Sequence, residues 1–256
     1  MKFEVVQILD RIKELYKLPR NKQRFDKYLF MLQGSSKDDL LLPIAGYNPM
    51  GKELAVTKLD ELIQLNAEEI AKAEVEKINQ SINSNVDRTI QVVINLVDDV
   101  EGSWSNPATT DYSSKFEIEP LIKRNFCTPY FWTSEDYSEK LIARRIREYV
   151  FRTIHRIKNG IPKTLKQAFE QEAFVQSMVM DPKEHATIHD FSKIEKFYIE
   201  HKNSDDYNLK FCFFYGDRDA ESLAYPTFDI RENEGFDYVK FLVSQRQLMQ
   251  NKARRN

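Results

Sequence analysis

Hydrophobic and polar positions along the chain follow two patterns, one typical of amphipathic helices and one typical of buried strands. In residues 3–17 the apolar side chains recur at the spacing of one helical face, and Pro19 ends the pattern. The same spacing predicts further helices over 22–33, 52–64, 67–83, 135–158, 163–180, 182–201 and 235–250. The first third of the chain is therefore predicted to be entirely helical.

Short apolar runs without polar alternation predict strands over 89–97 (TIQVVINLV) and 209–215 (LKFCFFY), with a shorter one over 225–230. Such runs are typical of strands that are buried on both faces of a sheet. A long connection, 98–132, follows the first run and leads to the helix at 135–158. Connections of this length inside a compact domain are usually functional, and the crevice beyond the carboxyl ends of strands is a common ligand site.

These elements predict a helix-rich α/β or α+β fold, with helices packed around a small, mostly buried sheet. A helical N-terminal part, 1–84, is expected to pack against an α/β core, 85–256, as one folding unit. The seven glycines are scattered, and no pair has the spacing of a dinucleotide fingerprint or a Walker loop. Rossmann-type and P-loop nucleotide sites are therefore excluded.

Net charge, hydrophobicity and cysteine spacing limit the kinds of partner and the cellular location to be expected. The 38 basic and 40 acidic residues nearly cancel, so no overall field favours nucleic acid or an anionic membrane, and neither is expected as a partner. No apolar run approaches the roughly 18 residues of a membrane span. The N-terminus does not resemble a signal peptide, and the two cysteines have no metal or redox spacing. A cytoplasmic protein is expected.

Acidic residues follow both long apolar runs, which makes them the strongest candidate site. The candidate catalytic residues are Asp98, Asp99, Glu101, Asp217 and Asp219. If the two runs are neighbouring parallel strands, these carboxylates converge at one end of the sheet. They would then suit a divalent metal such as Mg²⁺ or Mn²⁺, held by Asp99, Asp217 and Asp219, or an acid–base pair. The alternative is that acidic turns simply solvate the strand ends.

Arginines on the helix at 135–158 suggest an anion-binding face. Arg144 and Arg152, with Arg124 before the helix, could grip a carboxylate or phosphate through paired N–H groups. The alternative is a solvated ladder, because Arg144, Glu148 and Arg152 stand at successive four-residue steps.

The 102–132 segment is rich in aromatic residues, including Trp104, and carries polar side chains such as Asn106 and Asp111. Flat rings with a few polar groups are the usual composition of a small-molecule pocket. The candidate substrate-binding residues are Trp104, Asn106, Asp111, Arg124, Arg144 and Arg152. Alternatively, the rings fill the core and anchor the segment on the sheet.

The sequence gives weaker support to two other candidate sites, a zinc site and a cysteine nucleophile. His185 and His189 have the four-residue spacing of paired zinc ligands, but lysines flank them on the same helical face, which favours an exposed polar surface. Cys127 follows a positive charge and could act as a nucleophile with His155, but most free cysteines are buried.

Two functions remain open. The first is a metal-assisted hydrolase or transferase that acts on a small anionic substrate. The second is a non-catalytic ligand-binding or protein-interaction protein that uses the aromatic 102–132 segment. The enzyme requires the carboxylates to lie around one point, whereas the interaction protein requires an exposed aromatic patch.

Overall fold

The computed structural model describes the whole chain except residues 36–38, 83–85, 102–105, 182–189 and 254–256. The chain folds into two compact units, Met1–Val150 and Phe151–Asn256. A long helix, α7 (Glu139–Asn159), crosses the boundary between them. Each unit is described by itself.

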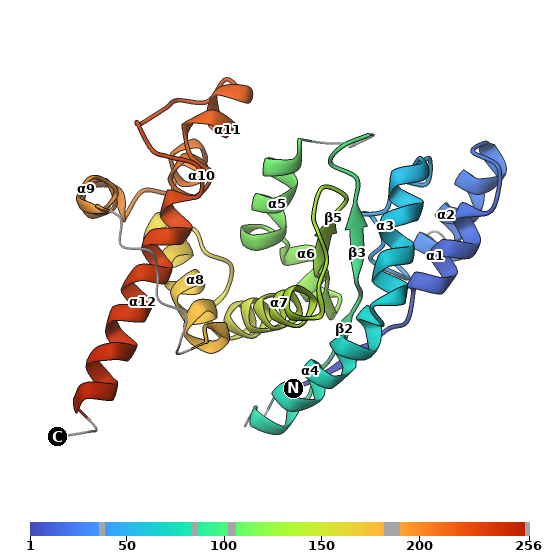
Figure 1. The fold of residues 1–256 in the computed structure, drawn as a ribbon, viewed down its shortest axis with the longest axis horizontal. Helices are drawn as coiled ribbons and strands as arrows, with labels where there is room; N and C mark the ends of the chain where they lie inside the picture. Colours follow the sequence, from blue (N-terminus) through green and yellow to red (C-terminus); the bar gives the residue numbers. More distant parts are fainter. Residues whose placement is uncertain (36–38, 83–85, 102–105, 182–189, 254–256) are drawn as a thin grey trace. The chain divides into compact units, whose positions relative to one another are not determined.

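A small parallel sheet forms the centre of the first unit (Figure 1). Strands β1 (Lys2–Val5), β2 (Thr89–Val92) and β4 (Phe126–Cys127) pair in parallel in the order β1-β2-β4. Strands β3 (Asn95–Val97) and β5 (Tyr130–Trp132) form a second parallel pair. Backbone hydrogen bonds from Val93 N to Cys127 O and from Asn95 N to Pro129 O continue the ladder from one pair to the other.

Helices fill every crossover between these strands, as parallel pairing requires. Those of the first unit are α1 (Leu9–Tyr16), α2 (Lys22–Gln33), α3 (Glu53–Gln64), α4 (Ala67–Ser81), α5 (Pro107–Phe116), α6 (Glu119–Lys123) and the first part of α7. Helix α4 packs on β1 and also covers its free edge, because the Asn79 side chain accepts from Phe3 N and donates to Phe3 O, both at 2.9 Å. The edge of the sheet is thereby satisfied by a side chain rather than by another strand.

The described residues of the second unit form helices joined by loops, without a strand. It contains the end of α7 and α8 (Leu165–Val179), α9 (Ser192–His201), α10 (Tyr207–Tyr215), α11 (Asp217–Ser222) and α12 (Glu234–Ala253). Helix α12 packs against α8, α9 and α10. Aromatic rings make much of the core, with Phe169 contacting Tyr198, Phe213 and Tyr238.

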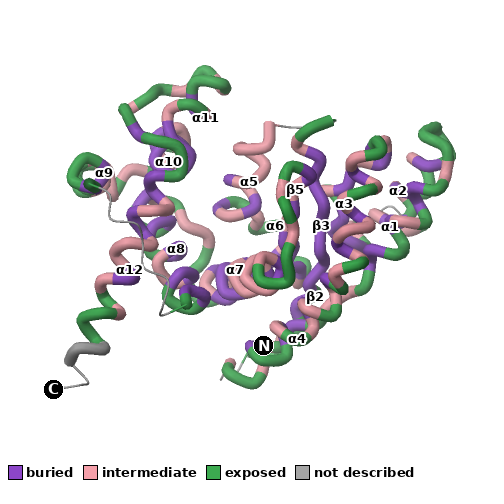
Figure 2. The backbone as a smooth tube through the Cα atoms, viewed as in Figure 1, coloured by how far each residue is buried: buried purple, intermediate pink, exposed green. Residues whose placement is uncertain are grey.

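The predicted fold class is confirmed, and the run at 89–97 is a strand region that is buried without interruption from Val92 to Val97 (Figure 2). The structure differs from the expected elements in several places. Residues 2–5 form β1 rather than the start of a helix. The 98–132 connection is not irregular, since it contains α5, α6, β4 and β5. The predicted helix over 182–201 is described only from residue 190, and α9 begins at Ser192.

The strand predicted over 209–215 is wrong, because these residues form helix α10. Asp206 caps its first turn by accepting from Leu209 N at 3.0 Å, and Gly216 ends it with a φ of 84°. The run is apolar on all sides because the helix is buried on all sides, from Phe211 to Tyr215. The shorter strand predicted over 225–230 is also absent, and these residues form an irregular segment.

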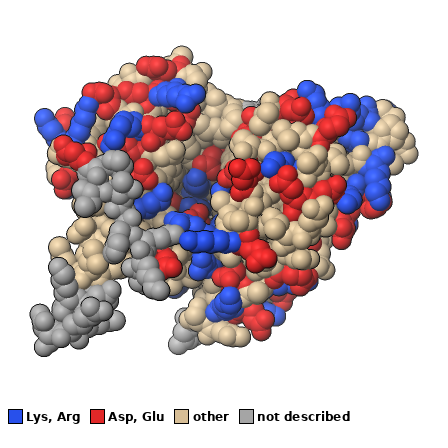
Figure 3. Space-filling view, in the orientation of Figure 1, with Lys and Arg blue, Asp and Glu red and all other residues tan. Residues whose placement is uncertain are grey.

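The predicted boundary after residue 84 falls inside the first unit, where β1 pairs along β2. On the face shown in Figure 3, basic and acidic side chains are intermixed, in keeping with the nearly balanced net charge. Among the described residues, no helix is both long enough and apolar enough to cross a bilayer.

Candidate functional site

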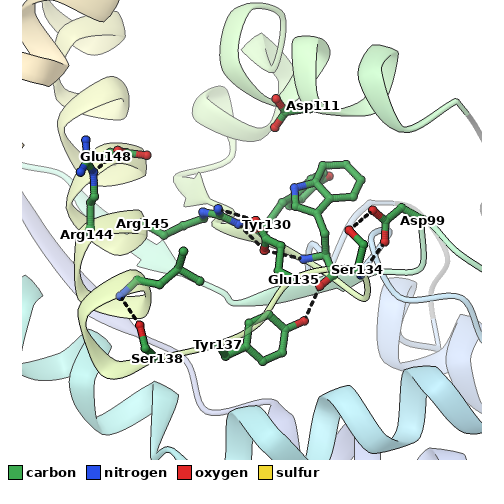
Figure 4. A network of polar contacts seen from close by, with 12 residues as sticks. Asp99, Asp111, Tyr130, Ser134, Glu135, Tyr137, Ser138, Arg144, Arg145 and Glu148 are labelled. Atoms are coloured by element: carbon green, nitrogen blue, oxygen red, sulfur yellow. Dashed lines mark hydrogen bonds and ion pairs between the residues drawn. The ribbon is translucent and has the colours of Figure 1, made fainter. Parts of the chain in front are cut away.

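The site with the most concentrated polar chemistry lies where β3 and β5 end (Figure 4). These strands are parallel, with Val97 opposite Trp132, so the residues that follow both strands emerge at the same edge of the sheet. Asp98 and Asp99 follow β3, and the Thr133–Glu135 turn follows β5. Polar side chains that follow the 89–97 strand therefore meet polar side chains that follow β5.

Asp98 is almost fully buried, with 3% of its surface exposed. Its Oδ1 atom accepts from Glu101 N at 2.9 Å, from Val100 N at 3.2 Å and from the Thr133 hydroxyl at 3.0 Å. Its Oδ2 atom is buried and has no hydrogen-bond partner among the described residues. An unsatisfied buried acceptor costs about 1–3 kcal/mol, and more when it is charged, so this oxygen marks a position where a ligand would be stabilising.

Asp99 is held by the turn after β5. Its Oδ1 accepts from Ser134 N at 3.0 Å and lies 2.9 Å from the Thr133 hydroxyl, while its Oδ2 accepts from the Ser134 hydroxyl at 2.6 Å. The Thr133 hydroxyl therefore lies between two carboxylates but has one proton to donate. This shared hydroxyl fixes the spacing of Asp98 and Asp99.

An ion pair between Arg145 and Glu135 stabilises the same turn. Arg145 donates to both carboxylate oxygens of Glu135, at 2.8 and 2.7 Å, and to Tyr130 O at 2.9 Å (Figure 4). Burial alone would lower the pKa of the Arg145 guanidinium, but its bonds and charge interaction with Glu135 outweigh burial and raise it. Glu135 in turn accepts from Trp132 N at 3.1 Å. The pair is neutralised internally and holds the turn that presents Thr133.

The remaining predicted carboxylates do not join Asp98 and Asp99 in the way the sequence suggested. Asp217 and Asp219 belong to the second unit and lie in the first turn of α11, not at the end of a strand. The premise of two neighbouring parallel strands is therefore wrong. Glu101 is exposed, and its backbone N–H rather than its carboxylate contacts Asp98.

Asp217 has a structural function in its own loop. Its carboxylate accepts from Phe228 N at 2.9 Å and Asp229 N at 2.7 Å, and it lies 3.1 Å from the Cys212 sulfur. Burial opposes ionisation of this carboxyl, but these donors outweigh burial and lower its pKa. The pKa of Asp219 is raised instead, by burial and by the nearby charge of Glu232.

Each of the three predicted anion-binding arginines has a carboxylate partner. Arg124 pairs with the exposed Asp39 at 2.6 Å, and Arg144 pairs with Glu148 at 3.0 Å, as the helical-ladder alternative predicts. Arg152, in the second unit, forms two bonds of 2.7 Å to the buried Glu172. Binding an anion would require each arginine to share or exchange its partner.

The other predicted residues have local structural contacts. Asn106 caps α5 by accepting from Thr109 N at 3.2 Å, and Asp111 pairs with Lys115 one turn later on the same helix. Trp104, His185 and His189 lie outside the described residues. Cys127 is buried in β4. Within the described part of the chain, no group of three or more histidine, cysteine or acidic side chains is placed to hold a metal ion.

The aromatic residues of the 102–132 segment mostly fill the core. Tyr112, Phe116, Phe126 and Phe131 are all buried. Tyr130 and Trp132 are partly exposed on β5, with their rings 6.4 Å apart. The core-packing interpretation fits the four buried rings.

Sequence reasoning missed Thr133, Ser134 and Glu135. The run Phe126–Trp132 could have indicated them, because it is mostly apolar and is followed by polar residues, as the first strand is. Its distance from the first strand in the sequence is also long enough for a helical crossover between parallel strands. Its Pro129 argues against a central strand, but here the proline falls in the short break between β4 and β5.

Comparisons with protein-family models, with curated proteins and with solved structures found no match to this chain.

Proposed function

We propose that the chain is a metal-assisted hydrolase or transferase that acts on a small anionic substrate at the carboxyl ends of β3 and β5. One observation carries the proposal, the buried Oδ2 atom of Asp98 without a hydrogen-bond partner beside a second carboxylate, Asp99. A divalent cation is the simplest occupant that would satisfy this oxygen and offset two adjacent negative charges.

The donor set fits a hard cation such as Mg²⁺ or Mn²⁺. Carboxylate and hydroxyl oxygens from Asp98, Asp99, Thr133 and Ser134 gather at one edge of the sheet. Mg²⁺ typically takes only one or two protein carboxylates and completes its shell with waters and substrate oxygens. Two carboxylates from this unit are therefore sufficient, without Asp217 or Asp219.

When bound, the cation would polarise a substrate oxygen and acidify a coordinated water. The protein residues provide the positions. Backbone N–H groups of Val100 and Glu101 orient Asp98, and the Thr133 and Ser134 hydroxyls orient Asp99. The ion pair of Arg145 with Glu135 holds the turn after β5. Attraction for an anionic substrate would come from the cation, since the predicted arginines already pair with carboxylates.

Thermal unfolding of the chelator-stripped protein tests this proposal, with Mg²⁺, Mn²⁺, Ca²⁺ and Zn²⁺ added one at a time. A cation at about 100 times its Kd should stabilise the protein by about 2.7 kcal/mol, and the shift should be lost in Asp98→Asn and in Asp99→Asn. Asp26→Asn is the matched control, because Asp26 is an exposed carboxylate of α2 in the same unit. The absence of a shift with all four ions would refute the cation site.

Turnover assays then separate an enzyme from a protein that only binds a cation. A panel of phosphate and carboxylate esters is assayed with and without the stabilising ion. Cation-dependent turnover that Asp98→Asn abolishes supports the proposal. Stabilisation by the ion without turnover of any ester would contradict the enzymatic part.

A further inference from the structure

The second unit has a pocket of its own, with a volume of about 270 Å³, where α7 ends and α8 begins (Figure 1). It is lined by His155 and Asn159 of α7, by Gln167 and Glu170 of α8 and by the 160–162 connection between the two helices. The volume is just below the usual range for drug-sized ligands, so the pocket suits a smaller molecule.

The charges around this pocket balance one another. Arg156 and Lys158 lie in the last turn of α7, where they offset the negative end of the helix dipole. Glu170 pairs with Lys166 at 3.8 Å, and the positive end of α8 faces the same pocket. Burial lowers the pKa of the His155 imidazole, so this ring carries no charge at pH 7. The surroundings therefore favour neither a cation nor an anion over a neutral molecule.

The amide side chain of Asn159 presents a hydrogen-bond acceptor to the pocket. Its Nδ2 atom donates to His155 O at 2.9 Å. Because a carbonyl oxygen can only accept, this contact fixes which end of the amide is the nitrogen. The Oδ1 atom is left as the open end, and it has no hydrogen-bond partner among the described residues.

The amide side chain of Gln167 presents the opposite group, a donor. Its Oε1 atom accepts from Lys163 N at 2.8 Å and from Thr164 N at 3.2 Å, as part of the capping box that begins α8. Backbone N–H groups can only donate, so the oxygen is fixed at this end and the Nε2 protons are open. One acceptor and one donor, each anchored through its other end, thus line the same pocket.

The connection between the two helices adds an apolar surface. Gly160 has a φ of 80°, and a Cβ atom there would meet no atom within 4 Å, so there is open space beside the end of α7. Ile161 and Pro162 form an apolar wall next to this space. A short alkyl group can lie against them.

From this arrangement we propose that the pocket binds a small neutral carboxamide. The amide N–H of the ligand donates to Asn159 Oδ1, its carbonyl oxygen accepts from Gln167 Nε2, and its alkyl chain packs on the apolar wall. A carboxamide carries donor and acceptor on separate atoms, so it satisfies both side chains at once. A protonated amine has only donors and a carboxylate only acceptors, so each leaves one of the two side chains unpaired. The proposal does not depend on the cation site in the first unit.

NMR titration of the full chain tests this proposal, with the Ile161 methyl groups as the reporter and butanamide as the probe. Butylammonium and butanoate are the charged controls, and methyl propanoate is a neutral ester of similar size without an N–H donor. Butanamide is expected to give saturable shifts at Ile161 and to bind more tightly than all three controls. A control that binds as tightly as butanamide would overturn the proposal, as would the absence of a saturable response to butanamide.

Gln167→Glu is the decisive variant, because Glu serves in a capping box as Gln does and keeps an oxygen for Lys163 N and Thr164 N. It replaces only the free donor with an acceptor. Butanamide binding should weaken by about fivefold or more, in line with the loss of one neutral hydrogen bond. Gln250→Glu, at an exposed position of α12 in the same unit, is the matched control and should leave the affinity unchanged. An unchanged affinity in Gln167→Glu, or an equal loss in Gln250→Glu, would contradict the assignment of the amide site.

Discussion

The buried ion pair between Arg152 and Glu172 provides a sharp test of whether Arg152 is a structural or a substrate-binding residue. Arg152 is 2% exposed and Glu172 is 0% exposed, and two bonds of 2.7 Å join them. Gln171 also donates to Glu172, at 2.9 Å. Arg152→Met keeps most of the side-chain volume but removes both bonds of 2.7 Å to the buried Glu172 carboxylate.

Breaking a buried pair from one side costs about 3–5 kcal/mol, because the remaining charge is uncompensated. We therefore expect Arg152→Met to lower the free energy of unfolding by that amount, and Glu172→Gln to have a similar effect. The double variant Arg152→Met/Glu172→Leu replaces both charges with apolar groups and should recover most of the loss. The coupling between the two positions should thus be several kcal/mol.

Urea unfolding of the full chain, followed by far-ultraviolet circular dichroism, measures all four proteins of this cycle. With a slope of about 1–3 kcal/mol per molar urea, the single variants should show midpoints lower by more than 1 M. A loss below about 1 kcal/mol in Arg152→Met, or a double variant whose loss equals the sum of the singles, would refute the structural interpretation. Arg152 would then be available for the substrate role that the sequence suggested.

Three further predictions concern the second unit. Gly216→Ala should destabilise the protein by more than about 2 kcal/mol in thermal unfolding, because φ is 84° and a Cβ atom would lie 2.5 Å from the Arg231 carbonyl oxygen; an unchanged melting temperature would contradict the geometry of this turn. Asp206→Ala should cost about 1 kcal/mol in urea unfolding through loss of the cap on Leu209 N, whereas Asp206→Ser should retain most of it; equal losses would argue against a capped helix at 207–215. Burial lowers the pKa of folded His155 below its ordinary value of 6.5. The neutral ring therefore contributes to stability above pH 6.5, and this contribution is lost as the pH falls from 6.5 to the pKa of the folded state. The free energy of unfolding should therefore decline less between pH 7 and pH 5 in His155→Gln than in the wild type, and parallel pH profiles would count against this origin.

Helices were predictable where their signals are local. Helix α2 begins at Lys22 after the Asn21 cap and ends before Gly34, as the sequence indicates, because Asn21 accepts from Gln23 N and Gly34 adopts a φ of 71°. Such contacts involve residues within one turn of each other. They form in the same way whatever the rest of the chain does.

The run at 209–215 was not predictable from hydrophobicity alone. A short apolar segment fits a strand buried on two faces and a helix buried on all sides equally well. The flanking Asp206 and Gly216 are the local signals that favour a helix, but the burial that requires Phe211, Phe213 and Phe214 to be apolar comes from packing with distant elements such as α12.

By itself, the sequence determined the helix-rich α/β class, the buried strand at 89–97 and the presence of acidic residues where that strand ends. Only the tertiary structure decided which groups meet those acids. The partners of Asp98 and Asp99 are Thr133 and Ser134, residues 34 or 35 positions later, and they meet because β3 and β5 are parallel neighbours. Strand pairing joins residues that share no local pattern, since it depends on backbone hydrogen bonds and on burial of both faces by helices. Asp217 and Asp219 also follow an apolar run in the sequence, but they lie in helix α11 of the separate second unit.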